Sequence, residues 1–150
     1  MIFFSPRILV LLLIQPVLVS TVIWSRSPTN VHVRTHMNCI MWDRWCYEIA
    51  LYETDSLLHD RINFDGVQCV DRIDRTVSLI GRDQGDGILD NFYEFELWIA
   101  HNCSRGGKIH KIVKTFNLVP VQNDNFFYES TEFLFGKGEV VSKYFDPFSP

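Results

Sequence analysis

The clearest structural signal in the sequence lies in residues 92–100, which read FYEFELWIA. Apolar and acidic side chains alternate along much of this stretch, and it is rich in aromatic residues. Because successive side chains of a β-strand point to opposite faces of a sheet, the alternation predicts a strand with one buried face. The stretch therefore indicates a β protein rather than a helical one.

The same period-two pattern recurs before and after this stretch. It is found in residues 31–39, 46–53, 76–80, 109–118, 126–135 and, over a shorter length, 139–141. Turn-rich segments separate these patterns, and only residues 54–60 could begin a helical turn. The sequence therefore predicts an antiparallel β-sandwich of roughly seven to eight strands with at most one short helical turn.

The composition is that of one small folded domain. Of 150 residues, 47% are hydrophobic and 14% aromatic, which is enough to form a hydrophobic core. The net charge of −4 argues against a nucleic-acid partner, because phosphate binding needs concentrated positive charge. His32 and His36 would lie about 13 Å apart on a strand, so we expect no metal site there, and no motif asks for a cofactor.

The N-terminal residues are expected to be a signal peptide rather than part of the fold. Arg7 precedes the apolar residues 8–14, and small residues follow at Ser20 and Ser25. The alternative is a membrane anchor, but Gln15 and Pro16 interrupt the apolar run before it could span a bilayer.

This leader predicts a secreted, extracellular protein with no transmembrane segment in the mature chain. We expect residues 1–25 to be the signal peptide and residues 26–141 the β-sandwich domain. The remaining residues 142–150 are expected to form a flexible C-terminal tail.

If the protein is secreted, its cysteines are expected to form disulfides. Cys39, Cys46, Cys69 and Cys103 are even in number, which in an oxidising compartment predicts two disulfides. Zinc binding would need closer pairs, and oxidation would consume a thiol nucleophile. The residues alone leave all three possible pairings of four cysteines open.

Two further positions are candidate surface sites. Trp42, Arg44 and Trp45 lie where a hairpin tip is expected, and aromatic and arginine side chains dominate binding hot spots. The alternative is that both tryptophans fold back onto the sheet edge. Asn102 begins the Asn-Cys-Ser sequon and is a candidate glycosylation site, although Cys103 within it is expected to form a disulfide.

Five segments carry a family resemblance. Residues 31–39 are similar to a Val-x-Val-Lys-Gly-x-Leu-x-Cys opening strand, and residues 47–53 match a cysteine-to-Leu-Tyr-Glu interval. Residues 54–60 are similar to the acidic segment that follows, and residues 95–103 and 127–134 to later strands. In this order the segments resemble the nematode transthyretin-like family of small secreted proteins.

The resemblance implies a transthyretin-like β-sandwich and a Cys39–Cys103 disulfide, because both cysteines match family cysteines. Cys46 and Cys69, which the family pattern lacks, are then left to pair with each other. The family's own later cysteines are missing here.

The resemblance also implies a non-enzymatic binding protein that acts outside the cell or at the cell surface, on an extracellular protein, a lipid or a small apolar ligand. One alternative is a carrier of a small apolar ligand, which would need a cavity. Another is a 5-hydroxyisourate-hydrolase-like enzyme, for which His32 or His36 could serve, but the Tyr-Arg-Gly-Ser terminus of those enzymes is absent.

Overall fold

The computed structural model describes residues 27–41, 44–55, 59–84 and 91–144. In chain order the elements are β1 (Thr29–Asn38), β2 (Trp45–Thr54), β3 (His59–Val70), β4 (Asp74–Asp83), β5 (Phe92–Tyr93), β6 (Phe95–His101), a 3-10 turn (Arg105–Gly107), β7 (Ile109–Thr115), β8 (Val119–Pro120), β9 (Asn125–Phe133) and β10 (Glu139–Val141). The prediction of an all-β protein is confirmed. The described helical turn lies between β6 and β7, and the 56–58 part of the segment expected to be helical lies outside the described residues.

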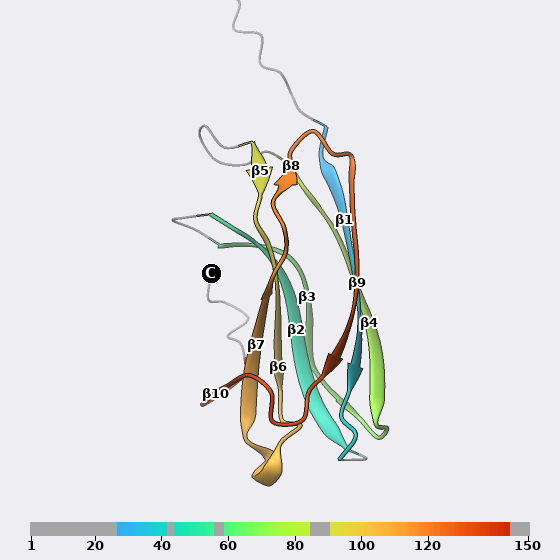
Figure 1. Ribbon diagram of the computed structural model, residues 1–150, viewed down its shortest axis with the longest axis vertical. Coiled ribbons are helices and arrows are strands. Elements are labelled where there is room, and N and C mark those ends of the chain that lie inside the picture. The colour runs from blue at the N-terminus through green and yellow to red at the C-terminus, as the bar shows by residue number, and fades with distance from the viewer. Residues whose placement is uncertain (1–26, 42–43, 56–58, 85–90, 145–150) are drawn as a thin grey trace, which may run out of the picture.

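The strands form two main sheets and one small one. The first sheet has the order β4-β1-β9, the second has the order β10-β7-β6-β2-β3, and β5 pairs with β8. Figure 1 shows the two main sheets running side by side along the long axis of the molecule. Most neighbouring strands are antiparallel, but β1 and β9 are parallel, so the expectation of a wholly antiparallel arrangement is wrong at this pair. The two strands are far apart in the sequence, and no tight hairpin has to join them.

The hydrophobic core lies between the two main sheets. Alternate residues of β1, among them Val31, Val33 and Met37, are buried and join one cluster with residues of β2 and β6 such as Leu51 and Leu97. Full burial of each such side chain stabilises the fold by about 1.5–3 kcal/mol. The alternation in the sequence therefore reports directly which face of β1 is covered.

Strand β3 was not expected from the sequence. Its twelve residues, HDRINFDGVQCV, show no regular alternation, and most are exposed or only partly buried. Its pairing with β2 is interrupted by two register shifts, and an interrupted register moves side chains from one face to the other. The period-two pattern is lost for this reason.

Two disulfides connect these elements. Cys39, just after β1, is bonded to Cys103, just after β6, and therefore links the two main sheets. Cys46 of β2 is bonded to Cys69, its register partner in β3. This is the pairing that the family resemblance implies.

The chain stays packed beyond the expected end of the domain. The hydroxyl of Tyr144 donates a hydrogen bond to the carbonyl of Cys46 at 3.4 Å, and the rest of the expected tail lies outside the described residues. The expected signal peptide lies outside the described residues. In the ranges that are described, no helix is long and apolar enough to cross a membrane.

Candidate functional site: an apolar loop tip

One end of the molecule exposes apolar side chains from two different loops. Ile40 and Met41 follow β1 and are 64% and 56% exposed, and Ile73, in the β3–β4 turn, is 48% exposed. In Figure 1 both loops lie at the same end. The backbone N–H of Cys39 donates to the carbonyl of Ile73 at 2.7 Å and joins them. We call Ile40, Met41 and Ile73 the apolar tip.

Trp45 forms the base of this tip and is not part of its exposed surface. It is the first residue of β2, and it faces the core like Tyr47 and Ile49 two and four positions later. Its indole N–H donates to the carbonyl of Arg72 at 2.8 Å and so holds the β3–β4 turn. Of the two readings left open for Trp45, the structure supports the one in which it folds back onto the sheet, because the strand begins one residue earlier than the sequence pattern indicated. Trp42 lies outside the described residues.

Arg44 is exposed, as expected, and lies beside the tip. Its guanidinium is 3.5 Å from the carboxylate of Asp71, and this contact connects the β1–β2 loop to the β3–β4 turn a second time. Arg44 also lines a hollow of about 200 Å³ together with Asn102 and the turn glycines Gly106 and Gly107. The structure thus brings together two residues, Arg44 and Asn102, that the sequence singled out for separate reasons.

The side chains of Asn102 and Ser104 in the sequon both form hydrogen bonds with the backbone of the folded chain. The side-chain oxygen of Asn102 accepts a hydrogen bond from the backbone N–H of Cys46 at 2.7 Å. The hydroxyl of Ser104 donates to the carbonyl of Lys108 at 2.7 Å and is buried. Glycosylation of Asn102 stays a prediction, and a glycan there would stand beside Arg44 near the apolar tip.

A second hollow, of about 440 Å³, lies on the outer face of the three-stranded sheet. It is lined by Arg34, His36, Thr76, Glu129, Ser130 and Thr131. Arg34 pairs with Glu129 at 3.3 Å, and a His36 ring nitrogen is 2.9 Å from the hydroxyl of Thr76. Its size suits a small molecule, but its lining is polar, whereas ligand pockets are mostly apolar. In the described ranges no group of three or more His, Cys, Asp or Glu side chains could hold a metal ion.

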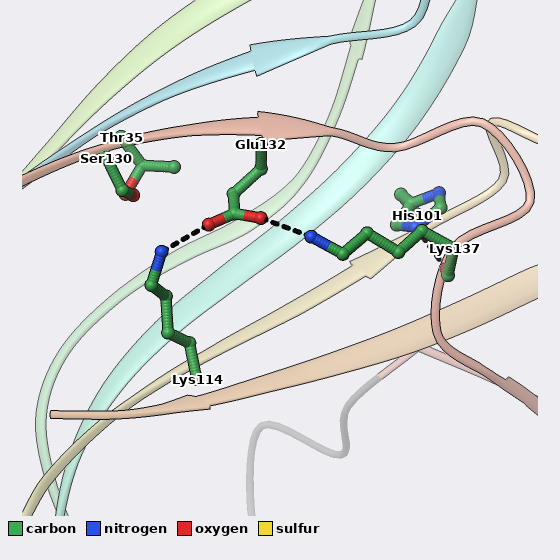
Figure 2. Close-up of polar contacts among 6 residues, drawn as sticks. All are labelled: Thr35, His101, Lys114, Ser130, Glu132 and Lys137. Atoms are coloured by element: carbon green, nitrogen blue, oxygen red, sulfur yellow. Dashed lines mark hydrogen bonds and ion pairs between the residues drawn. The ribbon is translucent and has the colours of Figure 1, made fainter.

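An ion network centred on one buried carboxylate crosses between the two main sheets (Figure 2). Glu132 of β9 is almost fully buried, and its two carboxylate oxygens lie 2.5 Å and 2.7 Å from the ammonium groups of Lys114 and Lys137. Burial alone would raise the pKa of Glu132, but the hydrogen bonds and charges of the two lysines outweigh it and lower the pKa. The network fixes β9 against β7 of the opposite sheet.

His101 holds the turn that supplies Lys137. The ring is fully buried, and its Nε2–H donates to the carbonyl of Lys137 at 3.0 Å. Gly138, next in this turn, has φ +98° and lies so close to the Lys111 carbonyl that a Cβ would clash. Burial lowers the pKa of His101 to about 4, His110 and Lys137 act in the same direction, and the bond to the carbonyl opposes them.

This depressed pKa predicts a loss of stability in acid. Above about pH 6.5, His101 is neutral in both the folded and the unfolded chain; between that pH and about 4 the unfolded chain binds the proton first. We expect the free energy of unfolding to fall by about 2–3 kcal/mol across this window, on top of other acid effects. Urea titrations of wild type and His101→Gln at several pH values measure it. A profile for His101→Gln as steep as that of the wild type would contradict the assignment.

The sequence did not point to the three residues of the apolar tip. The signal available was the presence of two apolar residues, Ile40 and Met41, in a segment expected to be a turn. The described fold and this tip define an all-β, disulfide-bonded protein that presents apolar side chains on two linked loops.

The model of the family "Caenorhabditis elegans protein of unknown function (DUF870)" matches residues 34–133, and the chain belongs to this family. The match includes all four cysteines and the whole apolar tip. The chain is also similar to "Uncharacterized protein B0416.7" of C. elegans, with 33% identity over 61 residues. That alignment covers 41% of this chain and 46% of the relative, so it spans less than half of the relative's length. No solved structure matches the chain.

Proposed function

We propose that this chain is a secreted, transthyretin-like β-sandwich that works by binding an extracellular or cell-surface partner and not by catalysis. The partner's contact surface on this chain is the apolar tip of Ile40, Met41 and Ile73. The observation that carries the proposal is that these side chains are exposed although the loops that bear them are tied down.

The disulfide and hydrogen bonds that hold the loops of the tip in place support a binding role. Cys39 is held by its disulfide and by its hydrogen bond to Ile73, and Arg72 by the indole of Trp45. A surface that is ordered before it meets its partner loses less conformational entropy on binding. Exposed apolar side chains gathered on such a surface, next to an arginine, are typical of protein contact sites.

The order of strands supports a transthyretin-like sandwich over an immunoglobulin-like one. In the immunoglobulin constant-type sandwich the first two strands share a sheet and the third lies in the other. Here β1 and β2 lie in different sheets, and β2 pairs with β3. The two disulfides and the leader-like residues 1–25 support the extracellular setting.

The other two functions have less support. A carrier of an apolar ligand would use the larger hollow, but that hollow is lined by polar side chains. A hydrolase of the 5-hydroxyisourate type would use His36, whose ring nitrogen already contacts Thr76, or His32, which does not line the hollow.

The tip is tested by giving it charge. Met41→Glu/Ile73→Glu places carboxylates on the apolar surface, and desolvating them on binding should reduce partner capture from nematode extracellular fluid by about tenfold or more. The measurement is quantitative mass spectrometry of proteins retained by the immobilised wild type and variant.

The matched control is Val140→Glu/Val113→Glu, since Val140 and Val113 are 55% and 47% exposed, close to the values of Met41 and Ile73. These residues lie on β10 and β7, away from the two loops of the tip. The control should capture what the wild type captures. Equal capture by the tip variant and the wild type would show that the tip is not the contact surface.

A further inference from the structure

Strand β9 forms an open edge of the three-stranded sheet. It is nine residues long, it pairs with β1 without a register shift, and within the described ranges no strand pairs with its other side (Figure 1). Two of its exposed side chains are large and apolar: Phe127 is 72% exposed and Phe133 65%. Such an edge is a template for another strand.

The backbone groups on this open side can be assigned. The carbonyl of Asp124 and the N–H of Leu134 form hydrogen bonds with β1. The backbone N–H and C=O groups of the even-numbered residues of β9 therefore point toward β1. Because the direction of the backbone groups alternates along a strand, the N–H and C=O of Phe127, Glu129 and Thr131 point to the open side. A second strand would find a regular row of donors and acceptors there.

The long edges of the other described strands are protected. β3 carries charges and two register shifts in its pairing with β2. β4 is covered at Ile80 and Gly81, where Asn63 donates to the Ile80 carbonyl and Ile62 lies against Gly81. β10 is three residues long, and β5 and β8 are two residues each. Charges, irregular pairing and short length are the usual means of blocking edge pairing.

β9 is neither short nor irregularly paired, and its charges are limited to Glu129 and the inward-pointing Glu132. Its sequence, NFFYESTEF, holds no lysine, arginine, proline or glycine and is rich in residues with high β-propensity. The ion pairs of Glu132 with Lys114 and Lys137 hold the strand in place from the inner side. The edge is therefore both rigid and open.

We infer that β9 pairs with β9 of a second copy of this chain, antiparallel across a two-fold axis. We choose a second copy as the partner because that copy presents the same long open edge, its own β9. When the two β9 edges pair with each other, both are used, so the assembly stops at a dimer and does not grow into a fibre. The two three-stranded sheets then form one continuous sheet. This interface is separate from the apolar tip and does not depend on the proposed function.

The backbone limits the register of the pair. Odd-numbered residues of one copy must lie opposite odd-numbered residues of the other copy, because only these residues point their N–H and C=O groups to the open side. A two-fold axis at Tyr128 meets this condition and sets Phe127 opposite the partner's Glu129. An axis at Glu129 would instead set two carboxylates opposite each other, which is unfavourable. In the Tyr128 register each Glu129 keeps its ion pair with Arg34 of its own chain.

The test uses one position and two substitutions. Glu129→Pro removes an outward N–H without removing a bond to β1, whereas Glu129→Ala keeps the N–H and removes the same carboxylate. Sedimentation from low micromolar to millimolar protein should give a dimer for wild type and Glu129→Ala. It should give a dissociation constant raised by about tenfold or more for Glu129→Pro.

A second pair of variants distinguishes edge pairing from association through the sheet face and does not depend on proline being tolerated. Phe127→Lys places a charge on the β9 edge, and Ile80→Lys places one on the same outer face but on β4, at 62% exposure. The first should be monomeric and the second dimeric. Hydrogen exchange should slow at the amides of Phe127, Glu129 and Thr131 as protein concentration rises. A monomeric wild type, an unchanged Glu129→Pro dimer or a monomeric Ile80→Lys would each overturn the inference.

Discussion

A Cys39→Ala/Cys103→Ala variant is expected to lose about 4 kcal/mol of the free energy of unfolding. The reason is that this disulfide closes 64 residues of chain, and the restriction it places on the unfolded chain grows with the length closed. Both cysteines are fully buried and the bond joins the two main sheets, so packing between the sheets is lost as well. Since small domains are stable by only about 5–15 kcal/mol, a large part of the stability depends on this bond.

The internal comparison is Cys46→Ala/Cys69→Ala. That bond closes only 23 residues within one pair of neighbouring strands, and its removal should cost less, about 3 kcal/mol. Guanidinium titrations of the two variants and wild type, followed by tryptophan fluorescence, give the three free energies. If removal of the shorter link cost more than removal of the Cys39–Cys103 bond, the view that the latter is the main connection between the sheets would be wrong.

The second large effect is expected from Lys114→Met/Lys137→Met, which leaves the carboxylate of Glu132 buried without its two cations. Breaking a buried ion pair from one side costs about 3–5 kcal/mol, because the remaining charge is not solvated. Glu132→Leu should cost much less, since the side chains it leaves behind, Lys114 and Lys137, are partly exposed and can reach water.

The difference in the free energy of unfolding between the variant and the wild type should depend on pH, and its direction follows from the pKa of Glu132. In the wild type the lysines lower the pKa of Glu132, so the stabilisation is present above the ordinary carboxyl pKa and is lost as pH falls through the lowered value. In the double methionine variant burial acts alone and raises that pKa, so the folded chain gains stability as pH falls. The difference between variant and wild type should therefore shrink between pH 7 and pH 4. A triple variant that adds Glu132→Leu should recover most of the loss, and a difference independent of pH would contradict the network.

Much of the fold was predictable because regular burial leaves a regular pattern. β1 and β6 each have one face toward the core, and their sequences alternate accordingly. β3 was missed because its register shifts and exposure remove the pattern. The parallel pairing of β1 with β9 was missed because nothing local to either strand records the direction of a partner almost a hundred residues away.

The expected hairpin tip is only partly found. The β1–β2 connection exposes residues, Arg44 among them, but it joins strands of different sheets and is not a hairpin. The sequence pattern placed Trp45 in the loop. In the structure Trp45 lies on the inward face of β2, where its indole N–H donates a hydrogen bond to the Arg72 carbonyl. Ile73 could not be associated with Ile40 and Met41 because only the tertiary fold brings the β3–β4 turn beside the β1–β2 loop.

The proposed contact surface is tested most directly by placing a photo-crosslinking amino acid at residue 41 in one protein and at residue 113 in another. Illumination in nematode extracellular fluid should then give a discrete crosslinked product from residue 41 and none from residue 113. The same product should disappear when Ile73→Glu is added to the first protein. Crosslinking from residue 113 alone, or equally from both positions, would contradict a binding surface at the apolar tip.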